Sequence, residues 1–218
     1  MNPPAQRLPW TVGIGLLLVL LTLALAFLFA GLRSRAVRSP SLPVYGQVAD
    51  FALTNQAGAR VSLADLRGHE WVADIIFTRC AGPCLKMSRQ MSELQKALPP
   101  SSGVKLVSLT TDPDFDTPAI LTTYARRFGA VPGRWIFLTG PKSEVGSLAS
   151  GSLKLSAVEN PAADRTSTGE LFIHSTIFVV VDKQARLRGS YETGGEGVDW
   201  ESEKQEILRA LSQLERER

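Results

Sequence analysis

The stretch from Val12 to Leu32, VGIGLLLVLLTLALAFLFAGL, constrains what this chain can fold into more than any other feature. It has no charged residue, and Thr22 is its only polar side chain. At about 1.5 Å per residue, a helix of this length crosses a hydrocarbon core of roughly 30 Å. A signal peptide has a shorter apolar region of about 7–15 residues, although Ala24-Leu25-Ala26 has the small-residue pattern of a cleavage site. We therefore predict a retained membrane anchor, with cleavage as the open alternative.

The anchor divides the chain into four parts. Residues 1–11 form a short N-terminal tail, 12–32 the transmembrane anchor, 33–43 a tether, and 44–218 one globular domain. The tether, RSRAVRSPSLP, is basic, rich in Ser and Pro, and without hydrophobic periodicity, as is typical of a linker. Its arginines follow the span, and the positive-inside rule taken literally would leave the globular domain in the cytoplasm.

The charge of the chain excludes one class of partner. The net charge is only +3, from 24 basic and 21 acidic side chains spread along the sequence. This is not the basic stripe that follows a phosphate backbone, so we expect no nucleic-acid partner. The two cysteines cannot build the dense disulfide framework of a small secreted fold. Their role therefore lies in chemistry or in one local link.

Segments of strand and helix character alternate along the globular part. This alternation predicts an α/β fold in which a central mixed sheet is flanked by helices and ends in an antiparallel hairpin. An earlier hairpin turns at Gly58, and the helix after the cysteines buries Met87, Met91, Leu94 and Leu98 on one face. The other elements are strands at 71–77, 104–109, 135–138, 176–181 and 187–191, and helices that begin at Thr117-Pro118 and at Asp199.

Both cysteines lie in TRCAGPCLKM, residues 78–87, between a strand and a helix. At the N-terminal end of a helix, unpaired amide groups and the positive end of the helix dipole favour thiolate over thiol, and Pro83 suits the first helical turn. The four-residue offset from Cys80 to Cys84 brings their β-carbons to about 5–6 Å. That spacing is compatible with a structural disulfide, two inert core thiols, a redox couple or part of a metal site.

Asp74 lies in the middle of the apolar strand at 71–77. If it is buried, it is hydrogen-bonded or has a raised pKa, and it becomes a candidate proton acceptor beneath the thiol pair. The alternative is that its side chain points to solvent, where most aspartates are found.

His174 directly precedes the strand at 176–181. A lone histidine is more often a hydrogen-bonded residue than a ligand. In a thioredoxin-like sheet, however, this strand lies beside the one that leads to Cys80. Two thiolates and one imidazole would then meet, a set that suits Cu(I), or Zn(II) with a fourth ligand. His69, at the opposite end of the strand at 71–77, is interpreted as a surface residue.

The sequence resembles the Sco/SenC family of membrane-anchored thioredoxin-fold proteins over about residues 47–191. The segments that carry the resemblance are FALTNQAGARVSL (51–63), FTRCAGPC (77–84), SLTTDPDFDTP (108–118) and HS (174–175). The sequence departs from the commonest family pattern in the Ala-Gly-Pro between the cysteines and in Leu85. Ala-Gly-Pro and Asp74 are similar to features of thioredoxins, whereas the thioredoxin cis-proline is absent before Thr176.

The resemblance implies a thioredoxin-like fold and Cu(I) bound by Cys80, Cys84 and His174. It implies a metallochaperone that delivers copper to the dinuclear copper centre of cytochrome c oxidase, with a copper-accepting subunit of the oxidase or a related copper protein and a thiol reductant as partners. It also implies the bacterial inner membrane, with the domain in the periplasm, where oxidation threatens such a thiol pair. Binding of Cu(II), the client and the oligomeric state are left open.

Two other functions compete with copper delivery. In a membrane-anchored thiol-disulfide oxidoreductase, Cys80 attacks a substrate disulfide, Cys84 resolves the intermediate and Asp74 handles the proton. Whether the protein is an enzyme of this kind is left open. A thiol peroxidase would need an arginine beside its reactive cysteine, and Arg79 is adjacent in sequence. The polar loop at 156–170 is either a flap over His174 or an ordinary long loop, and the docking partner of Trp200 and the terminal helix is not determined.

Overall fold

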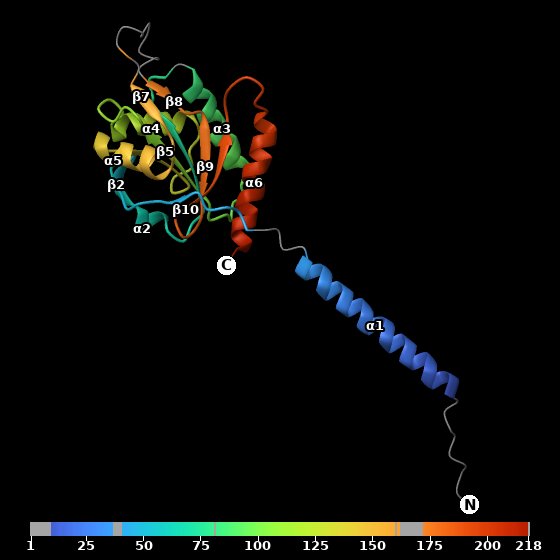
Figure 1. Ribbon diagram of the computed structural model, residues 1–218. Helices are drawn as coiled ribbons and strands as arrows, with labels where there is room; N and C mark the ends of the chain where they lie inside the picture. The colour runs from blue at the N-terminus through green and yellow to red at the C-terminus, as the bar shows by residue number, and fades with distance from the viewer. Residues whose placement is uncertain (1–9, 37–40, 81, 160, 162–171, 218) are drawn as a thin grey trace, which may run out of the picture. The chain divides into compact units, whose positions relative to one another are not determined.

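The computed structural model describes residues 10–36, 41–80, 82–159, 161 and 172–217 (Figure 1). The chain divides into two compact units, Met1–Pro40 and Ser41–Arg218. In the first unit, helix α1 (Trp10–Ala36) contains the segment Trp10–Phe29, which is long and apolar enough to cross a membrane. The helix continues through Arg33–Ala36, where a tether was predicted, because no Gly or Pro interrupts it there.

The second unit is built on an eight-stranded sheet in the order β1-β10-β9-β4-β5-β6-β2-β3. β4, β5 and β6 are parallel to one another, and β9 and β2 flank them in the antiparallel sense. A separate pair, β7 and β8, is antiparallel. The strands are β1 (Gly46–Gln47), β2 (Ala52–Asn55), β3 (Arg60–Ser62), β4 (Trp71–Ile76), β5 (Lys105–Thr110), β6 (Trp135–Thr139), β7 (Ala157–Glu159), β8 (Phe172–His174), β9 (Ile177–Val181) and β10 (Arg186–Glu192).

Helices cover both faces of the sheet, as predicted. Successive residues of β4 alternate between two cores: Val72 and Ile76 face one of them, and Ala73 and Ile75 the other. The first core contains α3 (Pro83–Ala97), α4 (Pro118–Arg127) and α6 (Trp200–Arg216). The second contains α2 (Leu63–Leu66), α5 (Lys142–Gly146) and the π-helix η1 (Ser147–Ser152).

Several local predictions are confirmed. The β2–β3 hairpin turns at Gly58, whose φ of +78° favours glycine, and α3 buries its predicted apolar stripe. Asp199 caps α6 by accepting a hydrogen bond from the Glu201 amide at 3.2 Å. Thr117 occupies the N-cap position of α4, but its side chain makes no capping hydrogen bond.

Two regions hold more structure than was predicted. The two-residue β1 pairs outside β10, so the β9–β10 hairpin is not the edge of the sheet. Part of the loop at 156–170 forms β7, which pairs with β8, whereas residues 160 and 162–170 lie outside the described part. Trp200 docks on the domain itself: its Nε1 donates to Glu93 on α3 at 2.6 Å, and its ring packs edge-on against Phe178.

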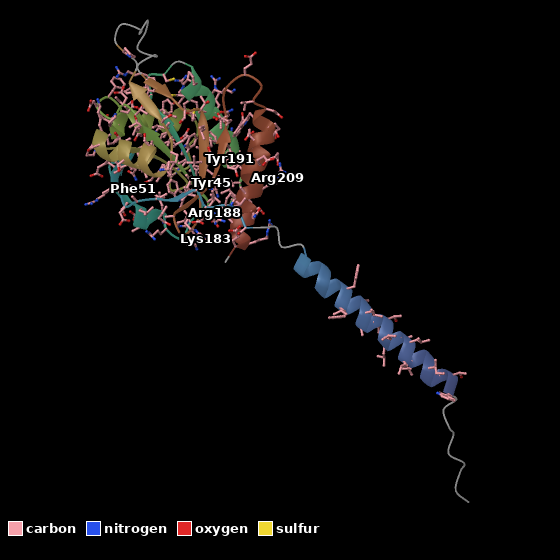
Figure 2. The ribbon with its side chains drawn as sticks, viewed as in Figure 1. Tyr45, Phe51, Lys183, Arg188, Tyr191 and Arg209 are labelled. Atoms are coloured by element: carbon pink, nitrogen blue, oxygen red, sulfur yellow. The ribbon has the colours of Figure 1, made fainter. Side chains whose placement is uncertain are left out.

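A buried arginine closes the domain where its chain begins and ends. Arg188 on β10 donates to Asp182 Oδ2 at 2.7 Å and to Glu217 Oε2 at 2.6 Å. It also donates to the carbonyl oxygens of Leu42 and Pro43, at 2.6 and 3.1 Å. Glu217 in turn accepts from the Leu42 amide at 2.9 Å. Figure 2 shows Arg188 with Lys183 at the end of the domain where β9 turns into β10.

We expect Arg188→Met to lower the free energy of unfolding by about 3 kcal/mol, because it leaves buried carboxylates and carbonyl groups without their donor. Arg209→Met is the matched control, since Arg209 is exposed and pairs only with exposed Glu206; it should cost less than about 0.5 kcal/mol. Urea unfolding of both variants in detergent micelles measures the difference. Equal losses of unfolding free energy in the two variants would contradict the stabilising role of the Arg188 contacts.

The ion pairs of Arg188 with Asp182 and Glu217 also make the stability of the fold depend on pH. Burial alone would raise the pKa values of Asp182 and Glu217, but their hydrogen bonds to arginine outweigh it and hold both below the ordinary values of 3.8 and 4.5. Carboxylates with lowered pKa values stabilise the fold above their unfolded pKa and lose this effect as the pH falls. The wild type should therefore lose more stability than Arg188→Met between about pH 5 and pH 3. Parallel losses in the two proteins would refute this assignment.

Candidate metal and thiol centre

The two cysteines lie where the most deeply buried strand meets a helix. Every residue of β4 is buried, and α3 begins shortly after it with Gly82 at the N-cap and Pro83 in the first turn. Cys80 is 4% exposed and Cys84 is fully buried. Both are present as thiols. The predicted arrangement of a strand, a cysteine turn and a helix N-terminus is confirmed.

Each of the two sulfur atoms accepts a hydrogen bond from a backbone amide. The Cys84 amide donates to Cys80 Sγ at 3.4 Å, and the Phe77 amide donates to Cys84 Sγ at 3.4 Å. Burial raises the pKa of the Cys84 thiol, and the hydrogen bond to Cys80 and the charge of Cys80 raise it further. Cys84 is therefore held in its thiol form.

Asp74 is fully buried, so the alternative in which it points to solvent is wrong. It shares the face of β4 that carries Val72 and Ile76, which is the face covered by α3. Burial and the neighbouring Cys80 raise the pKa of Cys84 most, and the charge of Asp74 raises it further. Asp74 therefore lies within electrostatic range of the thiol pair, and its role as proton acceptor stays a prediction.

Two carboxylates hold the turn that leads into Cys80. Asp116 is fully buried and accepts from the Thr78 amide at 3.1 Å and from the hydroxyl groups of Thr78 and Thr110. Asp112 accepts from Arg79 Nε at 3.1 Å. Neither role was predicted from the residue pattern, although both acids lie in the segment SLTTDPDFDTP.

The guanidinium of Arg79 is bound to other groups than a peroxidase would require. Its guanidinium forms an ion pair with Asp112 and lies 4.1 Å from the centre of the Phe115 ring. These contacts use both its charge and its planar face. They therefore argue against Arg79 as a group that activates peroxide at Cys80.

The backbone brings the strand that ends in His174 to the cysteine end of the sheet. β8 is followed by β9, and β9 pairs with β4. The Phe172 ring packs edge-on against Phe77 at 5.3 Å between ring centres, three residues before Cys80. The His174 side chain lies outside the described part, and no cluster of three or more potential metal-binding residues occurs among the side chains that the structure does describe.

His69 occupies the opposite end of β4, as predicted. Its Nδ1 lies 2.9 Å from the Gly103 carbonyl oxygen, and the side chain is partly exposed. It is therefore distant in the fold from the cysteine turn and serves as an internal comparison for His174.

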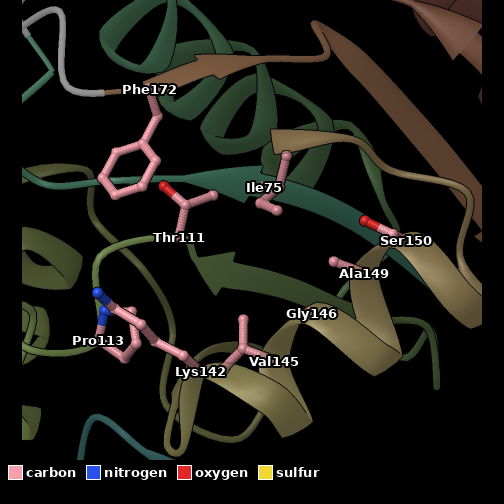
Figure 3. A pocket seen from close by; sticks show the side chains of 9 residues that line it. All are labelled: Ile75, Thr111, Pro113, Lys142, Val145, Gly146, Ala149, Ser150 and Phe172. Atoms are coloured by element: carbon pink, nitrogen blue, oxygen red, sulfur yellow. The ribbon is translucent and has the colours of Figure 1, made fainter. Parts of the chain in front are cut away.

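A pocket of about 240 Å³ lies beside Phe172. The Phe172 ring and Thr111 border it on one side, and Val145 and Ala149 of α5 and η1 on the other (Figure 3). Ile75 contributes from the carboxyl end of β4. Phe172 therefore contacts both this pocket and the core that contains the cysteines.

Comparison with known proteins identifies the family. The family model SCO1/SenC matches residues 44–209. The "SCO1 protein homolog" of Bacillus subtilis is 33% identical over 151 residues, which cover 68% of this chain and 75% of that protein.

Solved structures share the fold. BsSco, described as a member of the Sco family of cytochrome c oxidase assembly proteins with a disulfide switch, has a TM-score of 0.64 and 29% identity, and the match covers 79% of this chain and 98% of that one. Copper-bound ScoI of Bradyrhizobium japonicum has a TM-score of 0.62 and covers 76% of this chain and 99% of that one. Its 21% identity shows the fold alone. The predicted thioredoxin-like fold is thereby confirmed.

We expect iodoacetamide to alkylate Cys80 before Cys84, by about tenfold at pH 8, because burial raises the pKa of the Cys84 thiol and Cys84 is the more completely buried of the two. Peptide mapping after partial alkylation of the reduced protein measures the ratio. Cys80→Ser and Cys84→Ser are matched controls, since each leaves one thiol in the same turn. Faster alkylation of Cys84 would contradict the assignment of the two sulfur atoms.

Proposed function

Because the chain belongs to the SCO1/SenC family, we propose that it binds Cu(I) and delivers it to the dinuclear copper centre of cytochrome c oxidase. The observation that carries the proposal is the pair of buried thiols four residues apart, with Cys80 in the turn before α3 and Cys84 in its first turn. Anchorage through α1 in the bacterial inner membrane, with the second unit in the periplasm, completes the proposal. Copper is the cargo of the protein in this account.

The proposed ligands are Cys80, Cys84 and His174. Soft thiolates and an imidazole suit Cu(I), which accepts low coordination numbers. Loading converts the buried Cys84 thiol into a thiolate, so at least one proton leaves the site as copper enters. The charge of the metal then offsets the cost of burying that thiolate. Copper-bound ScoI of Bradyrhizobium japonicum supports this proposal at the level of the fold.

Transfer is proposed to proceed by ligand exchange. Thiolates of the accepting copper protein replace Cys80, Cys84 and His174 one at a time, so copper is never released to solvent. A disulfide between Cys80 and Cys84 offers no thiolate, and a thiol reductant must supply two electrons and two protons before copper binds. The disulfide switch described for BsSco is consistent with such a gate.

Thiol-disulfide exchange is the second candidate, and the inequality of the two sulfur atoms favours it. The Cys80 thiolate attacks a client disulfide and releases one client thiolate. Cys84 then loses its proton, for which Asp74 is the proposed acceptor, and attacks the Cys80 sulfur of the mixed disulfide, which releases the second client thiolate. The client gains two electrons, and Cys80 and Cys84 end as a disulfide. The contacts of Arg79 give no support to the third candidate, a thiol peroxidase.

Anaerobic titration of the reduced protein in micelles with Cu(I), against a competing chelator, tests the copper proposal. We expect one tight site that His174→Ala weakens by at least roughly tenfold, because a ligand is lost. His69→Ala is the matched control and should leave the affinity unchanged, since His69 contacts the Gly103 carbonyl group at the far end of β4.

Equal affinities in all three proteins would refute the three-ligand site. If copper binding were also indifferent to His174→Ala while disulfide exchange with a small dithiol persisted, the oxidoreductase would be the better account; weakened copper binding with exchange retained supports the copper proposal. Loss of both activities would instead indicate that the substitution disturbs the turn around Cys80.

A further inference from the structure

The second unit has two chemically different ends. β4, β5 and β6 are parallel, so one end of the sheet carries their starts and the other their carboxyl ends, where Cys80 lies. The chain enters the unit at the first of these ends, which we call the entry end. Arg188 fixes that entry through the carbonyl oxygens of Leu42 and Pro43. The position at which the chain comes in is therefore a defined part of the fold.

Basic side chains gather at the entry end. They lie before β4, at the starts of β5 and β6, and in the last turns of α3 and α4. All are at least partly exposed, and none takes part in an ion pair within the described part of the chain. This basic cluster consists of Arg67, Lys96, Lys105, Arg126, Arg127 and Arg134.

Acidic groups at the entry end do not neutralise the cluster. Glu70 pairs with Lys183, and Asp182 and Glu217 pair with Arg188. Exposed Asp65 and Glu215 also lie at this end, but they are fewer than the six basic residues of the cluster. The cluster therefore leaves an excess of positive charge around the point of entry.

Local structure explains only part of this distribution. Basic residues in the last turn of a helix complement the helix dipole, which accounts for those on α3 and α4. Lys105 and Arg134 also have a local role, because Lys105 donates to the Gly133 carbonyl oxygen at 2.7 Å and Arg134 to that of Pro100 at 2.8 Å, although both stay partly exposed. Arg67 lies just after α2. At the cysteine end, by contrast, the segment from β10 to α6 carries exposed Glu192, Glu196 and Asp199. The cysteine end also carries exposed Lys86 and Arg89, but the basic cluster of six residues lies at the end where the chain enters the unit.

We propose that the basic cluster is a docking face for a bilayer surface that contains anionic phospholipid headgroups. Arg and Lys side chains bind phosphate through charge-assisted hydrogen bonds, and exposed basic residues next to a membrane anchor are drawn to anionic lipid. Docking through the entry end turns Cys80 away from the bilayer. The proposal rests on α1 as a membrane anchor and is independent of copper binding.

Lysine acylation of the full-length protein in nanodiscs tests the proposal. One set of nanodiscs contains phosphatidylcholine alone, and the other contains phosphatidylcholine mixed with phosphatidylglycerol. Lys96 and Lys105 at the entry end should react several-fold more slowly in the anionic nanodiscs, whereas Lys86 and Lys142 at the cysteine end are internal controls and should not change. High salt should remove the protection, because it screens exposed charges.

Charge variants test whether the slower acylation comes from binding of the basic cluster to anionic lipid. Arg126→Gln combined with Arg127→Gln should restore the reactivity of Lys105 in anionic nanodiscs. Arg89→Gln, which removes an exposed charge near the cysteine end, should not. Equal labelling of Lys105 in the two lipid mixtures would overturn the proposal. Protection of Lys86 and Lys142 to the same degree would also overturn it, since it would indicate protein association. Cu(I) titration of the same samples reports separately on the proposed metal site.

Discussion

The burial of β4 on both faces is the constraint on which the rest of the second unit depends. Its side chains alternate between two cores, so helices must cover both sides of the sheet. The strand also leads the chain to the N-terminal end of α3, where Cys84 is fully buried. The position of the thiol pair is therefore set by the centre of the fold, and not by a surface loop.

The buried surroundings of the thiols limit the states that the pair can adopt. Two thiolates side by side would place two negative charges next to Asp74 in a region where burial already disfavours one on Cys84. Protonation of one sulfur, a bound cation or a disulfide each lowers that charge. The proposed copper transfer and the proposed thiol exchange would both draw on this electrostatic property.

Local patterns predicted most of the fold, and long-range pairs account for what was missed. The apolar run at 71–77, the stripe of Met87, Met91 and Leu94, and the cap at Asp199 depend on near neighbours in sequence, which periodicity and capping rules describe. The contacts of Asp116 with Thr78 and of Arg188 with Glu217 join residues 38 and 29 positions apart. Alternation alone also left the burial of Asp74 undecided, because a strand end can face either core or solvent.

The hydrogen bonds of Arg188 also determine how mechanical force would pass through the protein. A pull on the incoming chain reaches Leu42 and Pro43 first and passes through Arg188 to β10 and through Glu217 to the end of α6. The turn before Cys80 is held from another direction, by Asp112 and Asp116 after β5. The contacts that fix the entry of the chain and those that fix the turn before Cys80 therefore share no residue, and a disturbance of one set does not directly break the other.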